Sequence, residues 1–404
     1  MDYSNTNIER DAQYLNSKLS STSGVEFITD FWEKHYLKEY IKAGGSKIKF
    51  ITGNKGSGKS YLLNLFTQLS KNNGYLTVSF SANEVPLNDF KFIFLEILDK
   101  CNLDDLMYKC SIKIIEEMGY DSTEINQDES FIDYLASLGK NDALERGEIR
   151  NQLRKLFKEN PRMDNNFSIA CALLCGGILG QPFLEDYNKE LIMSWLTNEK
   201  GFRLTSLRKL GMSPARINKF NARQMLQSLS ELVMLSGYSG LIVTIDDLDV
   251  IVDRSSLAPI HYTKMKREDT YESIRQLIDD IDNFKNIMFL FGCSKDLIDN
   301  EKMGMKSYQA LWMRIQNEVG NDKINKFSDI IDMNEIAKQV YTPDLLINMS
   351  KHFSQQILNN EIEPTVITKE TAIKLIEKSN SGGIAIPLLV KNATLGITEI
   401  EGEQ

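Results

Sequence analysis

The stretch KIKFITGNKGSGKSYLL, residues 47–63, combines a short β-rich run, a glycine-rich turn and the start of a helical pattern. In the motif GxxxxGK[ST], glycines let backbone N–H groups turn inward around a phosphate, and the following helix N-terminus favours negative charge. The motif lysine reaches the β- and γ-phosphates, and the motif hydroxyl ligates Mg²⁺. A solvent-exposed loop is the alternative, but the flanking strand and helix favour binding of ATP and Mg²⁺. The residues that fit the motif are Gly53, Asn54, Lys55, Gly56, Ser57, Gly58, Lys59 and Ser60.

Further strand patterns place this turn in a parallel sheet. Apolar or β-rich runs recur at residues 75–80, 241–245 and 287–291, with another candidate near residues 327–331. Helical patterns separate them, which is typical of α/β folds. We therefore expect an α/β P-loop NTPase with a three-layer core around a parallel sheet.

Changes of pattern along the chain predict three segments. Residues 1–45 are expected to form an N-terminal helical segment, and residues 46–335 the ATPase core. Within this core, residues 101–200 lack strand alternation and are predicted to be a helical insertion. Residues 336–404 are predicted to form a C-terminal lid of two or three short helices.

Two acids follow the apolar run at residues 241–245. A carboxylate at the tip of a buried parallel strand can hold Mg²⁺, and the next acid can polarise an attacking water. We therefore predict that Asp246 is a metal partner, together with Ser60, and that Asp247 is the catalytic base. A pair of solvated acids at a strand end is the alternative reading.

Polar residues after the next strand are further candidates. Ser294 lies just beyond residues 287–291, where its hydroxyl could sense the γ-phosphate or simply stabilise a turn. Cys293 is the second choice for this position. Arg314 is predicted to reach the γ-phosphate of a neighbouring subunit and to stabilise transition-state charge, with Arg275 as a weaker candidate. A surface arginine lying along its helix is the alternative for Arg314.

Charge and apolar content limit the partners. The 404-residue chain has 47 Lys and Arg against 56 Asp and Glu, a formal net charge of −9, so no global positive field attracts nucleic acid or anionic membrane. The polar N-terminus predicts no signal peptide, and the longest apolar run, residues 167–180, is shorter than the roughly 20 residues that span a bilayer. We expect a cytoplasmic protein that does not contact a membrane.

One segment runs against this acidic balance. Residues 201–230 hold six basic residues and no acid, so any contact with DNA is expected here, through phosphates. A solvated helix face or a surface for an acidic protein partner are the alternatives. The basic residues are Arg203, Arg208, Lys209, Arg216, Lys219 and Arg223.

The chain resembles the P-loop ATP-binding proteins of BREX-type phage-defence systems, the BrxC/BrxD-like relatives within the AAA+/ASCE-like ATPases. The resemblance is carried by AGGSKIKFITGNKGSGKSYLL at residues 43–63, NARQMLQSLSELVMLSGYSGLIVTIDDLD at residues 221–249 and SYQALWMRI at residues 307–315. It implies an ATPase in antiviral defence that self-associates and works beside a helicase or another DNA-processing protein.

The sequence departs from that family at two places. Asp247 and Asp249 stand where the family usually has Glu, and the stretch GGIAIPLLVK, residues 382–391, lacks the arginine that AAA+ lids often place on the γ-phosphate. Both departures favour slow or partner-activated hydrolysis. Two alternatives stay open: a STAND-like signalling switch that rarely hydrolyses its nucleotide, and a DNA-loading ATPase of the initiator type.

Overall fold

A five-stranded parallel sheet forms the centre of the molecule. The computed structural model describes residues 24–125, 129–140, 143–316, 325–356 and 365–397. The strand order in the sheet is β2-β3-β4-β1-β5. The first residue of each strand lies at most three residues from the first residue of a strand predicted from the sequence, so those predictions are confirmed. The strands are β1 (Ser46–Thr52), β2 (Leu76–Ser81), β3 (Leu241–Asp246), β4 (Ile287–Cys293) and β5 (Ile330–Asp332).

Alternating side chains of the strands build two cores, one on each face of the sheet. On β4, Phe289 and Phe291 belong to one core, whereas Met288 and Leu290 belong to the other. All four side chains are buried, as expected for a parallel sheet that is covered on both faces. The molecule therefore has the three-layer α/β arrangement predicted from the sequence.

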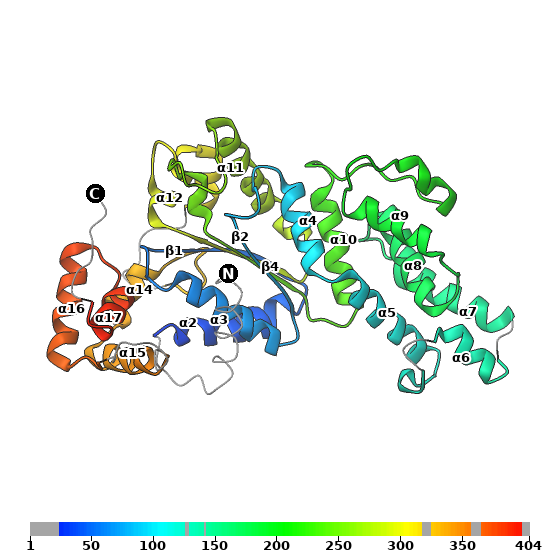
Figure 1. Ribbon diagram of the computed structural model, residues 1–404, viewed down its shortest axis with the longest axis horizontal. Helices are drawn as coiled ribbons and strands as arrows, with labels where there is room; N and C mark the ends of the chain where they lie inside the picture. Colours follow the sequence, from blue (N-terminus) through cyan, green and yellow to red (C-terminus); the bar gives the residue numbers. More distant parts are fainter. Residues whose placement is uncertain (1–23, 126–128, 141–142, 317–324, 357–364, 398–404) are drawn as a thin grey trace.

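Helices cover both faces of the sheet (Figure 1). One face carries α2 (Glu26–Trp32), the π-helix η1 (Glu33–Ile41) and α3 (Lys59–Asn72). The other face carries α4 (Phe90–Lys100), α10 (Ala222–Leu235), α11 (Lys264–Asp279) and α13 (Gln309–Ile315). Short helices complete the connections: η5 (Leu248–Ile251), η6 (Ile281–Asn283), α12 (Lys295–Asp299) and η7 (Met305–Ser307).

The described residues between α4 and α10 hold helices and no strand. These helices lie together on one side of the sheet, and their core is continuous with that of the sheet (Figure 1). Cys171 and Cys175 are both buried on α8, and all five cysteines of the chain are free thiols. The helices are α5 (Leu103–Glu117), η2 (Ser122–Glu124), α6 (Phe131–Ser137), α7 (Ala143–Leu153), η3 (Arg154–Lys158), α8 (Asn165–Leu179), α9 (Asp186–Leu196) and η4 (Leu204–Leu210).

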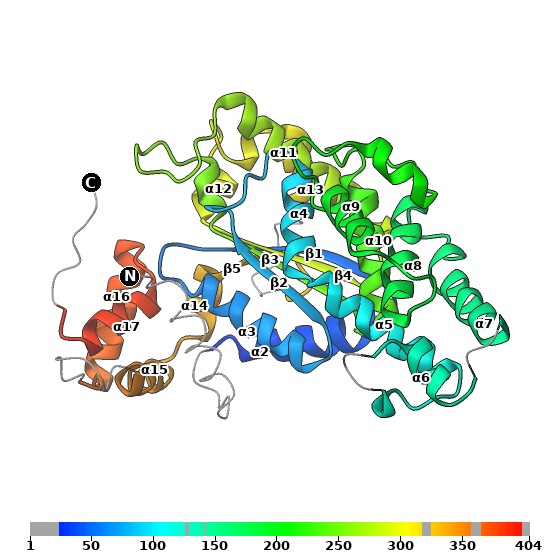
Figure 2. The ribbon, with the colours of Figure 1, turned by 45° about the vertical axis from the view of Figure 1, so that its right-hand side comes forward.

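A small helical unit follows β5 at the opposite end of the molecule (Figure 2). Its described residues form the helices α14 (Met333–Val340), α15 (Pro343–Gln356), α16 (Lys369–Gly382) and α17 (Ile386–Thr394). Leu346 and Val390 are fully buried in a core of its own. Among the described residues, no helix is long and apolar enough to cross a membrane.

Candidate nucleotide-binding site

The phosphate-loop motif connects β1 to α3, at the carboxyl edge of the sheet. Gly58 precedes the helix with φ +95°, and Gly56 has φ +78°, so both use backbone conformations that side chains rarely adopt. A Cβ on Gly53 would come within 2.6 Å of the Ser57 hydroxyl. The loop therefore needs its glycines to close, as the motif predicts.

Polar groups of the loop are arranged to meet an anion. The Lys59 ammonium donates to the carbonyl oxygens of Gly53 and Asn54, at 2.9 and 3.2 Å, and so folds back over the loop. The hydroxyl of Ser57 is buried without a hydrogen-bond partner among the described residues. A buried polar group of this kind normally has a partner, so the loop fits an incoming phosphate. Lys55, by contrast, is exposed.

The predicted metal pair is brought together at the tip of β3. The Ser60 hydroxyl donates to Oδ2 of Asp246 at 2.5 Å. Gly292 on the neighbouring strand β4 leaves the space that the Asp246 carboxylate occupies. Burial raises the pKa of Asp246, and the hydrogen bonds from Ser60 and from the Asp247 backbone oppose this shift. A hydroxyl beside a carboxylate at a phosphate loop is a donor set that suits Mg²⁺.

Asp247 lies at the rim of the site. Its backbone has φ +60°, and its N–H donates to Oδ1 of Asp246 at 2.9 Å. The exposed carboxylate accepts a hydrogen bond from the Ser81 hydroxyl at 2.6 Å. Asp249 instead accepts the backbone N–H of Ser294 at 2.8 Å, which ties it to the start of α12. Of Asp247 and Asp249, only Asp247 faces solvent beside Asp246.

Ser294 and Cys293 lie where β4 ends and α12 begins. The Ser294 hydroxyl accepts the backbone N–H of Leu297 at 3.1 Å and so caps α12. Its predicted role at the γ-phosphate stays a prediction. Cys293, the second choice for this role, is fully buried, and burial raises the pKa of its thiol. A role of Cys293 at the γ-phosphate also stays a prediction.

Arg314 lies far from the phosphate loop of its own chain. It lines a cavity with Ser46 and Lys47, at the amino end of β1, whereas the loop follows the carboxyl end of that strand. At about 3.3 Å per residue, the seven residues of β1 put roughly 20 Å between these edges. Its guanidinium makes two hydrogen bonds to Asp279, at 2.6 and 3.2 Å. Any role at a nucleotide is therefore a role in a neighbouring subunit.

Arg275, the weaker candidate, also binds Asp279 and pairs with Glu272. It contributes to the same network of ion pairs on α11. The hydrogen bond from Arg275 is the main cause that lowers the pKa of Glu272 to about 2, and burial opposes this shift. The network fixes α13 on α11.

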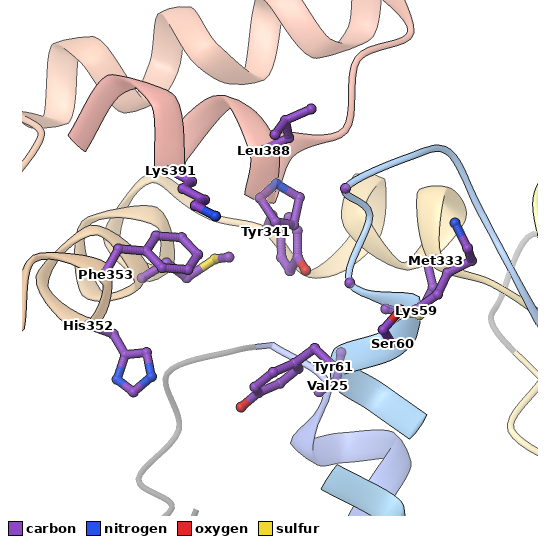
Figure 3. Close-up of a pocket in the computed structure, with 14 residues that line it drawn as sticks. Val25, Lys59, Ser60, Tyr61, Met333, Tyr341, His352, Phe353, Leu388 and Lys391 are labelled. Carbon is purple, nitrogen blue, oxygen red and sulfur yellow. The ribbon is translucent and has the colours of Figure 1, made fainter. Parts of the chain in front are cut away.

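A cavity of about 330 Å³ adjoins the phosphate loop (Figure 3). Its volume is in the range of small-molecule sites. One wall is the loop and the start of α3, and the opposite wall comes from α15 and α17. Lys391 extends from α17 toward the cavity, beside Phe353 and Tyr341. The lining residues are Val25, Gly56, Gly58, Lys59, Ser60, Tyr61, Met333, Tyr341, Met349, His352, Phe353, Pro387, Leu388 and Lys391.

The helical unit is joined directly to the phosphate loop. The side-chain amide of Asn54 donates to the carbonyl oxygen of Gly383 at 2.5 Å and accepts from the amide of Asn334 at 3.1 Å. A Cβ on Gly56 would collide with Leu388 of α17. The loop and α17 are thus in direct contact at the edge of the cavity.

Sequence reasoning missed two residues of this site. Gly292 is an isolated glycine within an apolar strand, which is a recognised sign that another group approaches closely. Lys391 ends the stretch GGIAIPLLVK, which lacks the arginine that AAA+ lids often place on the γ-phosphate. Lys391 lies on α17, across the cavity from the phosphate loop, and the spacing of residues in the sequence does not reveal this arrangement.

Comparison with known families agrees with this geometry. Residues 34–381 match the family described as BREX system ATP-binding protein BrxC/D. The chain belongs to this family. The match covers most of the chain, from η1 to the end of α16, and confirms the resemblance deduced from the sequence. As a BrxC/D-family member it has an ATP-binding role in phage defence. No curated protein and no solved structure matches the chain.

Proposed function

We propose that the chain binds ATP with Mg²⁺ between the phosphate loop and α17, hydrolyses it slowly, and couples its nucleotide state to a larger BREX assembly. The observation that carries this proposal is the hydrogen bond from Ser60 to Asp246, at 2.5 Å. It joins the phosphate loop to the tip of the acidic strand, beside a cavity of ligand size. The strand order, with β4 between β1 and β3, supports an AAA+/ASCE-like core.

Different side chains bind the phosphates, hold the metal and activate the water in the proposed reaction. Lys59 leaves the two loop carbonyls and reaches the β- and γ-phosphates, while Ser57 gains a partner for its buried hydroxyl. Ser60 and Asp246 hold the metal, which when bound neutralises charge on the phosphates. Asp247 orients and deprotonates the attacking water, since its carboxylate is exposed next to Asp246.

Slow turnover is favoured by two observations. Asp247 is one methylene shorter than Glu, and its carboxylate already accepts a hydrogen bond from Ser81 at 2.6 Å.

The hydrogen bond from Asn54 to Gly383 links the loop to the C-terminal helices, so nucleotide binding is expected to move them. This coupling favours a nucleotide-dependent switch as the second candidate function.

Self-association is part of the proposal. Arg314 and Asp279 are each 36% exposed, at the sheet edge opposite the phosphate loop. A surface ion pair contributes little stability. A phosphate of the ATP bound to a neighbouring subunit could therefore replace Asp279 as the partner of Arg314. Within BREX, a helicase or another DNA-processing protein is the proposed further partner.

Calorimetry with ATP tests the site. Lys59→Ala is expected to weaken ATP binding by at least about tenfold, since it removes a charged hydrogen bond worth roughly 1.5–3 kcal/mol. Lys55→Ala is the matched control, because Lys55 belongs to the same loop but is exposed. Equal affinity in wild type and Lys59→Ala would contradict the assignment. Turnover measured with Mg²⁺ and with a chelator then separates hydrolysis from binding.

A further inference from the structure

A cationic surface lies between α9 and α10, within residues 201–230, the segment that holds six basic residues and no acid. The structure divides these residues by role. The Arg216 guanidinium donates to the backbone carbonyls of Glu199 and Phe202, at 3.2 and 2.7 Å. Arg223 pairs with Asp280 at 2.8 Å. These two arginines stabilise the fold.

The other four cations are exposed, and no carboxylate among the described residues lies within ion-pair distance of them. They are Arg203, Arg208, Lys209 and Lys219. A cation that the fold does not pair stays available to an external anion. Exposed acids also lie on α9, among them Asp186 and Glu190.

Two exposed aromatic rings accompany these cations. The Lys209 ammonium lies 4.5 Å from the ring centroid of Tyr187, which is 57% exposed. The Lys219 ammonium lies 5.2 Å from the ring centroid of Phe220, which is 81% exposed. Phe220 therefore contributes almost nothing to the core, although it is a large apolar side chain.

The segment that carries these groups is held in place. Figures 1 and 2 show it running along the outside of the molecule from α9 to the start of α10. The Trp195 indole donates to the carbonyl oxygen of Ala215 at 3.0 Å, and the amides of Asn218 and Asn221 donate to that of Arg216 at 3.0 and 3.1 Å. The surface is thus ordered before any partner binds.

We propose that this surface binds single-stranded nucleic acid. The four unpaired cations contact phosphates, and Tyr187 and Phe220 stack on bases. Unpaired bases expose the π-faces that such rings need, whereas the bases of a duplex are covered by their neighbours. An acidic peptide would satisfy the cations but would leave both rings without partners. The proposal does not depend on ATP binding.

Fluorescence anisotropy with the full-length chain tests this proposal. The probes are a labelled oligothymidine of roughly 20 nucleotides and a duplex of equal length, titrated between about 50 and 200 mM salt. We expect tighter binding of the single strand. In Arg208→Ala/Lys209→Ala the slope of log affinity against log salt should flatten by about 0.7 per lost phosphate contact. Phe220→Ala should lower affinity at least about fivefold with little change of slope.

Matched variants separate these effects from a general loss of charge or fold. Lys34→Ala/Lys302→Ala removes two exposed cations elsewhere, and Tyr108→Ala removes a ring that is 47% exposed on α5. Both should bind like wild type, with unchanged thermal unfolding. Absence of oligothymidine binding at the lowest salt, or equal effects of control and surface variants, overturns the proposal. Binding of polyglutamate without oligothymidine also overturns it and assigns the surface to an acidic protein.

Discussion

The Asp246 carboxylate occupies the space that a side chain on Gly292 would fill. A Cβ at position 292 would approach Oδ1 of Asp246 more closely than real Cβ atoms approach any heavy atom. Leu63 of α3 closes the same space at 2.9 Å. The position of the Asp246 carboxylate, which we propose as a metal ligand, is therefore set by the absence of a side chain at Gly292 on the neighbouring strand.

Gly292→Ala should displace Asp246 and separate it from Ser60. We expect Mg²⁺-dependent ATP binding to weaken at least about tenfold, with a destabilisation of about 1–3 kcal/mol from overpacking. Calorimetry with and without Mg²⁺, together with chemical unfolding, measures both effects. Gly147→Ala is the control, because a Cβ there would meet only the end of the Arg150 side chain, at 4.0 Å, and should stabilise α7 by up to about 1 kcal/mol. Wild-type Mg²⁺ dependence in Gly292→Ala would show that Asp246 does not serve the metal.

Asp247→Asn should retain ATP but lose turnover. The amide keeps the shape of the side chain and still accepts from Ser81, but it cannot take a proton from water. Loss of a general base is expected to lower kcat by about a hundredfold or more. Asp249→Asn is the comparison, because Asp249 holds the backbone of Ser294 and should affect stability instead. Wild-type turnover in Asp247→Asn, measured by phosphate release, would place the base elsewhere.

Lys391→Ala should weaken ATP binding by roughly five- to thirtyfold. No carboxylate among the described residues pairs with Lys391, although it lines the cavity opposite Lys59. A charge-assisted contact with a phosphate would be worth about 1–2 kcal/mol at this partly exposed position. Lys391→Arg should preserve most of the affinity. Lys374→Ala, an exposed lysine on α16, is the control, and equal affinities in Lys391→Ala and this control would remove Lys391 from the site.

The sequence predicted the elements of this fold better than their contacts. Buried parallel strands are short apolar runs, and the phosphate loop is a local motif, so β1, β3 and β4 could be located from the residues alone. The burial of Lys49 could not be predicted from the sequence. A lysine in a strand is normally exposed, yet this side chain is fully buried. The groups that make its burial possible come from η1 and from the segment before β5.

Lys49 predicts a specific pH dependence of stability. Its ammonium donates to the carbonyl oxygens of Lys326, Phe327 and Ser328, at 3.4, 3.2 and 2.6 Å. Burial lowers its pKa to about 7; nearby Lys47 adds to this effect, and Asp329 opposes it. An unfolded lysine has a pKa near 10.4, so above pH 7 the unfolded chain binds more protons than the folded one. The free energy of unfolding should therefore rise with pH from about 7.

Lys49→Met should lose this rise, which amounts to at most about 1.4 kcal/mol per pH unit. Urea unfolding between about pH 6 and pH 8.5 measures it. Above that range the five buried cysteines act in the opposite direction, because unfolded thiols ionise from about pH 8.5. Lys71→Met, an exposed lysine on α3, should keep the wild-type profile. The same pH profile in Lys49→Met and wild type would show that Lys49 stays charged in the folded chain.

Arg314→Ala should abolish most hydrolysis if the arginine acts in a neighbouring subunit. An arginine of this kind is worth roughly a thousandfold or more in kcat. Specific activity of the wild type should then rise with protein concentration. A mixture of Arg314→Ala and Lys59→Ala should recover some activity, because one subunit supplies the arginine and the other the intact loop.

Asp279→Asn separates this role from a structural one. Asp279 holds Arg314 in the isolated chain, so a merely structural ion pair would make Asp279→Asn as harmful as Arg314→Ala. If Arg314 acts on a neighbouring nucleotide, freeing it from Asp279 should leave turnover unchanged or raise it. Thermal unfolding of both variants, compared with turnover over a range of protein concentrations, distinguishes the two roles. Equal losses of activity and stability in both variants, with turnover independent of concentration, would assign Arg314 to the packing of α13 on α11.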